Sequence, residues 1–208
     1  GPLLDPLTSA SLAALAPEKV VERLAPVFET LDRVKSALAP ETTLIGFCGS
    51  PWTVATYMIG GKGSPDQAAA RLFALTRRPE FDRLIDILVS ASIAYLVAQF
   101  RAGADVVQLF ESWALNLDER QFADLVIAPN ARIVAGVRQI IPGASIIGFP
   151  RGAAGMIPAY VAATGVDAVG LDYAMPLAVA DAGPTAGPGQ SRSAAARCRR
   201  RSARPAGR

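Results

Sequence analysis

The chain has 208 residues, 51% of them hydrophobic, which is enough apolar sequence for one substantial core. It has no run of roughly 18 apolar residues, so we expect no membrane-spanning helix, and the lack of a basic and apolar leader argues against secretion. The formal net charge of +3 is uneven. Residues 183–208 hold seven of the 21 basic residues and no acidic one, which leaves 14 basic and 18 acidic residues in 1–182. Because the basic excess belongs to the tail, we predict no nucleic-acid partner for the body of the chain.

The two cysteines, Cys48 and Cys198, are far apart and lie in very different sequence contexts. This cysteine usage favours a reduced, cytoplasmic chain. The sequence begins with Gly1 rather than with Met, and we expect the natural N-terminus to lie further upstream.

Helical and strand-like segments alternate along the chain. Short β-branched and apolar runs predict strands at 43–47, 105–110, 145–149 and 167–171. Helical spacing of apolar residues, with proline and capping signals, predicts helices at 17–38, from Pro51 onward, and at 65–77, 79–101, 118–127, 129–141 and 153–164. We expect Pro26 to bend or split the first helix and Ser64 to cap the helix at 65–77.

This alternation predicts an α/β protein with a parallel sheet and helices packed outside it. A doubly wound sheet and a (β/α)8 barrel both fit the strand spacing. No G-x-G-x-x-G follows a strand, which argues against a dinucleotide site. Polar residues stand just past the strand ends, where a barrel carries its chemistry: Ser50, Thr53, Glu111, Ser112, Arg151, Asp172 and Tyr173. We therefore predict a partial (β/α)8 TIM barrel with about four of the eight strands.

Residues 46–61 join the first predicted strand to a helix through a glycine-containing turn. Gly46 and Gly49 allow a close approach of the backbone, and Pro51 suits the first position of a helix. On these features alone, an ordinary βα unit whose glycines serve only the turn is the simpler interpretation.

Three sequence blocks together carry a more specific signal. The first is Gly46-Phe47-Cys48-Gly49-Ser50-Pro51-Trp52-Thr53-Val54, followed by Tyr57. The second, at 103–114, reads Gly-Ala-Asp-Val-Val-Gln-Leu-Phe-Glu-Ser-Trp-Ala, and the third, at 164–173, reads Thr-Gly-Val-Asp-Ala-Val-Gly-Leu-Asp-Tyr. In this order and spacing, the blocks resemble the uroporphyrinogen decarboxylase family, and the resemblance covers about residues 1–182.

The resemblance implies a cytoplasmic, homodimeric lyase of porphyrin biosynthesis that uses neither metal nor cofactor. Such an enzyme converts the four acetate groups of uroporphyrinogen III to methyls, giving coproporphyrinogen III. Tyr57 then corresponds to the catalytic tyrosine, which also binds substrate, and Ser112 to a substrate-binding serine. Phe47 and Gly49 correspond to positions that line the substrate pocket. Without the resemblance, Tyr57 would be interpreted as a core or surface tyrosine and Ser112 as a helix N-cap.

Several family features do not occur in this sequence. The family's Met-Arg-Gln-Ala-Gly-Arg block and its pyrrole-binding aspartate are expected upstream of Gly1, and the chain contains no histidine to match the family's C-terminal one. We therefore expect this chain to be inactive on its own. Residues 183–208 are predicted to form a basic, disordered tail. Residues 187–193 can be encoded so that a shift of one nucleotide yields Val-Gln-Gly-Asn-Leu-Asp-Pro, which resembles the family's continuation, so we interpret the tail as out-of-frame sequence.

Two other functions fit parts of the sequence. A corrinoid-type methyltransferase can share the barrel, but it holds zinc with His and Cys, and residues 1–182 contain one cysteine. A non-enzymatic protein could bind anionic partners through the basic tail. We rank both below the decarboxylase family.

Overall fold

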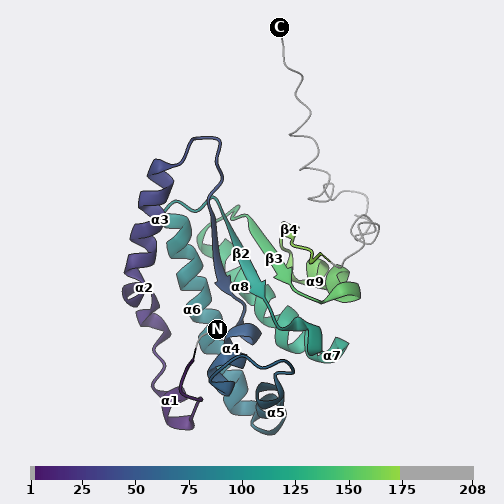
Figure 1. Cartoon of the computed structure of the whole chain (residues 1–208). Coiled ribbons are helices and arrows are strands. Elements are labelled where there is room, and N and C mark those ends of the chain that lie inside the picture. Colours follow the sequence, from purple (N-terminus) through teal and green to yellow (C-terminus); the bar gives the residue numbers. More distant parts are fainter. Residues whose placement is uncertain (1–2, 174–208) are drawn as a thin grey trace.

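The computed structural model describes residues 3–173, so the predictions for the tail at 183–208 lie outside the described residues. Its sheet has the strands β1 (Ile45–Gly49), β2 (Val106–Glu111), β3 (Ile146–Pro150) and β4 (Ala168–Val169). All neighbouring strands are parallel, and the order is β1-β2-β3-β4 (Figure 1). The predicted parallel α/β architecture with four strands is confirmed. The last strand is shorter than the five residues predicted at 167–171, because only Ala168 and Val169 pair with β3.

Helices connect and flank these strands. The α-helices are α1 (Ser9–Ala13), α2 (Val20–Arg23), α3 (Ala25–Ala37), α4 (Pro51–Gly60), α5 (Ala68–Thr76), α6 (Arg78–Arg101), α7 (Glu119–Phe122), α8 (Ala128–Ile140) and α9 (Ile157–Thr164). Short 3-10 turns occupy Pro17–Lys19, Ala114–Asn116 and Ala154–Met156, and a π-helical turn at Ala123–Ile127 joins α7 to α8. None of the described helices is both long enough and apolar enough to cross a membrane.

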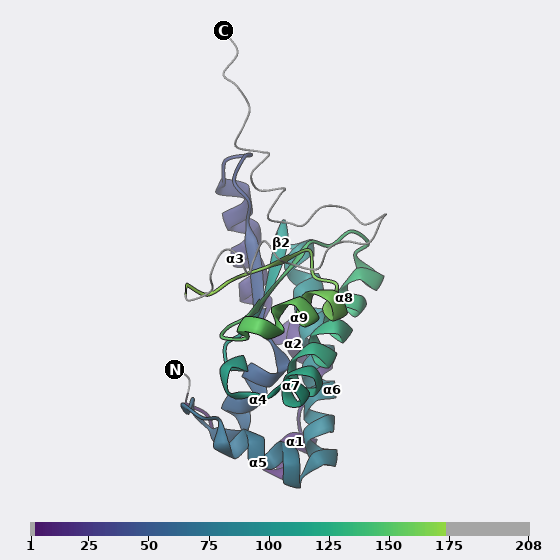
Figure 2. The ribbon, with the colours of Figure 1, turned by 90° about the vertical axis from the view of Figure 1, so that its right-hand side faces the viewer.

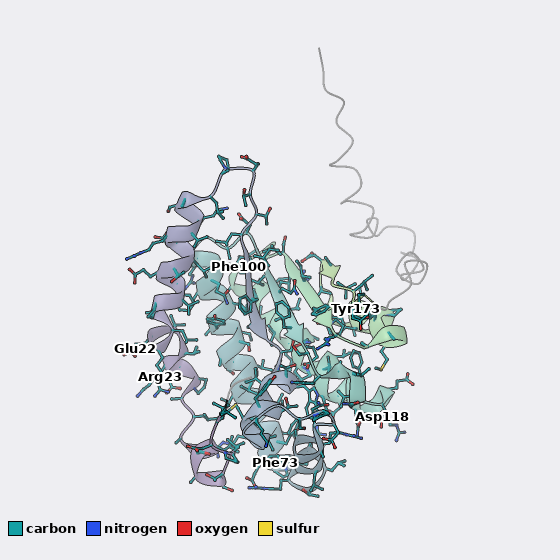
Figure 3. All side chains as sticks on the ribbon, viewed as in Figure 1. Glu22, Arg23, Phe73, Phe100, Asp118 and Tyr173 are labelled. Atoms are coloured by element: carbon teal, nitrogen blue, oxygen red, sulfur yellow. The ribbon has the colours of Figure 1, made fainter. Side chains whose placement is uncertain are left out.

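Local signals explain most helix boundaries. The backbone leaves the helical conformation at Leu24, directly before α3, whose second residue is Pro26, so the predicted split is confirmed. Pro51 begins α4 as predicted. Asp118, labelled in Figure 3, caps α7 by accepting a hydrogen bond from the Gln121 N–H.

The predicted cap at Ser64 is wrong. Helix α5 begins only at Ala68, after Gln67 in a left-handed conformation with φ of 50°. The Ser64 hydroxyl instead donates to Asp66, and the Asp66 carboxylate accepts from the Ala68 N–H at 3.2 Å. The local side-chain network therefore moves the start of the helix three residues downstream of the first expected position at 65.

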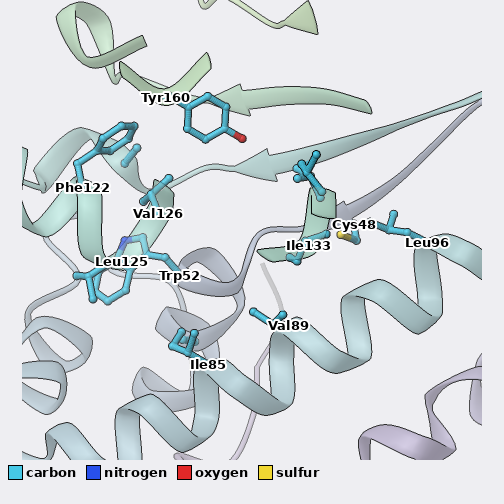
Figure 4. Packing of buried hydrophobic residues seen from close by; sticks show 14 of the residues in the cluster. Cys48, Trp52, Ile85, Val89, Leu96, Phe122, Leu125, Val126, Ile133 and Tyr160 are labelled. Carbon is cyan, nitrogen blue, oxygen red and sulfur yellow. The ribbon is translucent and has the colours of Figure 1, made fainter. Parts of the chain in front are cut away.

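The two faces of the sheet have different environments. Alternate strand residues such as Gly46, Val107, Leu109 and Ile146 point toward α4, α6, α8 and α9 and are buried. Figure 4 shows side chains from these helices packed against this covered face. The opposite face, which carries Phe47, is less covered (Figure 2). The hydrophobic core therefore lies on the helical side of the sheet.

Candidate functional site

Of the predicted site residues, Gly49 and Ser112 lie at the carboxyl edge of the sheet, Tyr57 lies on the helix beyond it, and Phe47 lies in the middle of β1. Parallel strands all end at the same edge, which is where α/β proteins place their ligands. Backbone hydrogen bonds tie the residues that follow β1 and β3 to the end of β2: the Ser50 N–H donates to the Phe110 carbonyl and the Arg151 N–H to the Glu111 carbonyl, both at 2.9 Å. Arg151 is exposed at this edge.

Tyr57 lies on the last turns of α4 and lines an open hollow. Its ring centroid lies 6.2 Å from that of Trp113, which follows β2 in the chain. The hollow has a volume of about 370 Å³ and is lined by Leu3, Tyr57, Lys62, Gly63, Ser64, Pro65 and Trp113. Lys62 is the one charged residue among them. An aromatic pair beside an ammonium group suits a flat ligand that carries negative charge.

Ser112 is half-buried next to Trp113, and the structure connects it to the helix that carries Tyr57. Its backbone N–H donates to the Thr53 hydroxyl at 2.8 Å. The indole N–H of Trp52 donates to the Trp113 carbonyl at 3.2 Å. Ser112 and Tyr57, which are 55 positions apart in the sequence, therefore belong to one unit formed by α4 and the loop after β2.

Phe47 and Gly49 lie on β1, and neither is among the residues that line the hollow. Phe47 is 58% exposed on the less covered face, where its ring meets Phe110 edge to face, and Phe110 meets Phe149 in the same way. A Cβ at Gly49 would lie 2.9 Å from Val54 Cγ2, so this glycine permits a tight turn into α4. The structure thus places these two positions on the sheet and Tyr57 on a helix beyond its end.

A buried glutamine holds the segment around Phe47 in place. Gln99 of α6 is 2% exposed, and its amide donates to the Phe47 carbonyl while its side-chain oxygen accepts from the Phe47 N–H, both at 2.9 Å. A Cβ at Gly46 would lie 2.6 Å from this oxygen. Gly46 therefore makes room for the close approach of Gln99. The sequence predicted a close approach at this glycine but did not show which group approaches it.

A buried polar cluster lies behind the site. Glu111, at the end of β2, is fully buried, and its carboxyl accepts a hydrogen bond from the Thr53 hydroxyl. Burial raises the pKa of Glu111 to about 8, against the opposing effect of the Thr53 hydroxyl and the backbone N–H groups of Trp113 and Thr53. In the sequence, Thr53 and Glu111 both stand near predicted strand ends, and no motif gives them a role of their own. The sequence does contain one signal for a buried acid, because Glu111 directly follows the apolar strand residues Leu109 and Phe110.

The chain belongs to the class of β/α-barrel proteins, with a partial sheet. Its strands are parallel, its helices cover one face, and polar and aromatic side chains gather at the carboxyl edge. A family model described as uroporphyrinogen decarboxylase (URO-D) matches residues 1–191. The chain belongs to the uroporphyrinogen decarboxylase family.

Curated relatives with the name uroporphyrinogen decarboxylase support this assignment. The chain is 50% identical over 180 residues to the protein of Sinorhizobium fredii, and this match covers 86% of this chain and 52% of that protein. It is 48% identical over 190 residues to the protein of a Chelativorans species, and the match covers 91% of this chain and 56% of that protein. It is 51% identical over 180 residues to the protein of Brucella abortus, and the match covers 86% of this chain and 53% of that protein. The chain thus spans about half the length of these relatives, and the corrinoid methyltransferase and tail-binding alternatives are not favoured.

Proposed function

We propose that the chain contributes to a uroporphyrinogen decarboxylase, a carboxy-lyase that converts the four acetate groups of uroporphyrinogen III to methyls and yields coproporphyrinogen III. The family assignment supports the reaction. The observation that carries the assignment of the site is the hollow at the carboxyl edge, where Tyr57 and Trp113 stand beside Lys62.

The reaction needs little from the protein beyond positioning and charge stabilisation. The electron-rich pyrrole is first protonated at a ring carbon, and the resulting cationic ring accepts the electron pair of the breaking C–C bond as carbon dioxide leaves. The exocyclic carbon then gains a proton to become a methyl group, and the ring carbon releases its proton. No separate electron sink is needed, so the proposal includes neither a metal nor a cofactor. The protein must hold an anionic macrocycle and stabilise the charge that develops on it.

In this proposal, Tyr57 is the catalytic residue and also binds substrate through its hydroxyl group. Ser112 binds a substrate carboxylate or pyrrole group from the loop after β2. Phe47 and Gly49 lie on β1 outside the hollow, and we propose that they contact another part of the macrocycle, with Phe47 doing so through its exposed ring. We also propose that the full family enzyme works in the cytoplasm as a homodimer, and that it has no nucleic-acid or membrane partner.

Binding of uroporphyrin to chain 1–208 tests this function. Uroporphyrin is the stable, oxidised form of the ligand with the same carboxylates, and its binding can be followed through quenching of tryptophan fluorescence, since Trp113 lines the hollow. We expect Tyr57→Ala to weaken binding about tenfold, because it removes both a ring contact and a hydroxyl. Tyr57→Phe should weaken it less, because the ring remains.

Tyr95→Phe is the matched control, because Tyr95 is also half-buried but lies on α6 against Phe28. It should leave the affinity unchanged. We expect chain 1–208 to produce no coproporphyrinogen from uroporphyrinogen, because Lys62 is the one cation among the described residues that line the hollow, and the substrate carries several carboxylates. Equal affinities of the parent chain and Tyr57→Ala would contradict the site, and chromatographic detection of coproporphyrinogen would contradict the expected inactivity.

A further inference from the structure

Glu111 and Thr53 form a buried pair where the end of β2 meets the start of α4. Glu111 is fully buried and Thr53 is 7% exposed. The Thr53 hydroxyl donates to Glu111 Oε1, whereas Glu111 Oε2 is buried and has no hydrogen-bond partner among the described residues. Burial of a carboxyl group costs stability, so a position that served packing alone would be better filled by an apolar side chain.

The chemistry of the Thr53 hydroxyl fixes the direction of this network. A backbone N–H can only donate, so the Thr53 oxygen accepts from Ser112 N at 2.8 Å. The hydroxyl has a single proton, and that proton goes to Glu111. A continuous chain of hydrogen bonds therefore runs from Ser112 through Thr53 to Glu111.

The pair also sits at the beginning of the helix that carries Tyr57. Ser50 occupies the N-cap position of α4, but its side chain makes no capping hydrogen bond. Thr53 is the third residue of α4, and its backbone N–H faces the Glu111 carboxyl closely enough to lower the pKa of that group. Tyr57 follows Thr53 by four positions, so both lie on the same side of the helix.

We propose that Glu111 and Thr53 are positioning residues for the ligand site. The pair holds the Ser112–Trp113 loop against α4 and thereby sets the separation between Trp113 and Tyr57 on the two sides of the hollow. Neither residue lines the hollow, so they act through Ser112, Trp113 and Tyr57. The effect on ligand affinity rests on the proposed function, whereas the effect on the loop does not.

Variants of chain 1–208 can separate positioning from stability. Thr53→Val removes the hydroxyl at nearly constant shape, and Thr53→Ser retains it. Glu111→Leu removes the buried carboxyl and leaves the Thr53 hydroxyl without its acceptor. The hydrogen bond from Trp52 to the Trp113 carbonyl remains in all three, so we expect the loop to stay folded. Thr56→Val is the matched control: Thr56 is 5% exposed on the same helix, and its hydroxyl donates to the Thr53 carbonyl.

The first measurement is amide hydrogen exchange without ligand. In Thr53→Val, exchange of the Ser112 N–H should accelerate about tenfold, because its acceptor is gone. In Glu111→Leu it should accelerate less. Thr53→Ser and Thr56→Val should exchange like the parent at this position. Exchange in the middle of α6 should be the same in all variants.

The second measurement is uroporphyrin affinity together with the midpoint of urea unfolding. Glu111→Leu should bind about five- to tenfold more weakly while its midpoint does not fall, since removing the desolvation cost of the buried carboxyl offsets the lost hydrogen bond from Thr53. A purely structural role predicts that affinity and midpoint fall together. The proposal is overturned if Thr53→Val and Glu111→Leu both keep the parent's Ser112 exchange rate. If the parent chain does not bind uroporphyrin, the proposed function fails, but the exchange data still decide whether the pair positions the loop.

Discussion

The Glu111 carboxyl group is surrounded by core residues, and burial raises its pKa to about 8. Tyr160 of α9 interacts electrostatically with Glu111. Burial raises the pKa of Tyr160, so Tyr160 loses its proton at a higher pH than Glu111 does. Asp105 and Glu80 have their pKa values lowered, by hydrogen bonds from Lys35 and Arg77 respectively, and titrate below it. Glu111 therefore changes charge in a range of pH that these other groups leave free.

Stability should fall as the pH rises from about 4.5 to about 8. In this range the folded chain keeps the Glu111 proton, whereas an unfolded chain releases it near the ordinary value of 4.5. The unfolded state then binds fewer protons, so the free energy of unfolding decreases with pH, by at most about 1.4 kcal/mol per unit. Urea unfolding at a series of pH values measures this slope. Glu111→Gln should flatten this slope. If the variant has the same slope as the parent chain, the pH dependence arises from other groups.

At the scale of elements, α9 packs on β3 through Tyr160. This side chain is fully buried, and its hydroxyl accepts a hydrogen bond from Asn130 Nδ2 of α8 at 3.2 Å. Gly148 of β3 makes room for the ring, because a Cβ there would lie 2.4 Å from Tyr160 Cε1 and 2.6 Å from its hydroxyl oxygen. The position of α9 thus depends on the absence of a side chain on the neighbouring strand.

Gly148→Ala should therefore destabilise the chain by about 1–3 kcal/mol, the usual cost of overpacking a core. The added methyl group must displace Tyr160, and with it the hydrogen bond to Asn130. Thermal or urea unfolding measures the effect. Gly155→Ala is the control, because a Cβ at Gly155 meets nothing within 4 Å. Equal stabilities of the two variants would show that α9 adjusts without cost.

At the scale of the molecule, the sheet has one well-covered face and one face with exposed apolar side chains. On β1, Ile45 is 49% exposed and Phe47 58% exposed, and Phe47, Phe110 and Phe149 form a row of rings across three strands. Among the described strands, β1 and β4 each pair with a single neighbour. Apolar side chains that gather in this way attract apolar ligands more strongly than scattered ones.

A dye that fluoresces on apolar surfaces, such as anilinonaphthalene sulfonate, should bind this face. The double variant Ile45→Ser with Phe47→Ser should lose most of the dye fluorescence, because it interrupts the apolar row. Ile140→Ser provides the control, since Ile140 is also 49% exposed but lies at the end of α8. If both variants reduce the signal equally, the dye does not report on the sheet face.

The sequence alone determined the features that depend on near neighbours along the chain. The alternation of strands and helices, the split before Pro26 and the start of α4 at Pro51 follow from side-chain periodicity and proline geometry, which act within a few residues. The three sequence blocks at 46–57, 103–114 and 164–173 likewise indicated the family. Ser64 shows the limit of such signals, because nearby Asp66 and Gln67 form a different local network.

Only the tertiary structure decided which side chains meet across the sheet. Thr53 and Glu111 are separated by 58 positions, and Gln99 and Phe47 by 52, so no local pattern could pair them. The structure also placed Trp113 beside Tyr57 and left Phe47 on a different surface. The physical reason is that hydrogen bonding and packing between distant segments depend on strand register and helix placement, which the whole chain establishes together.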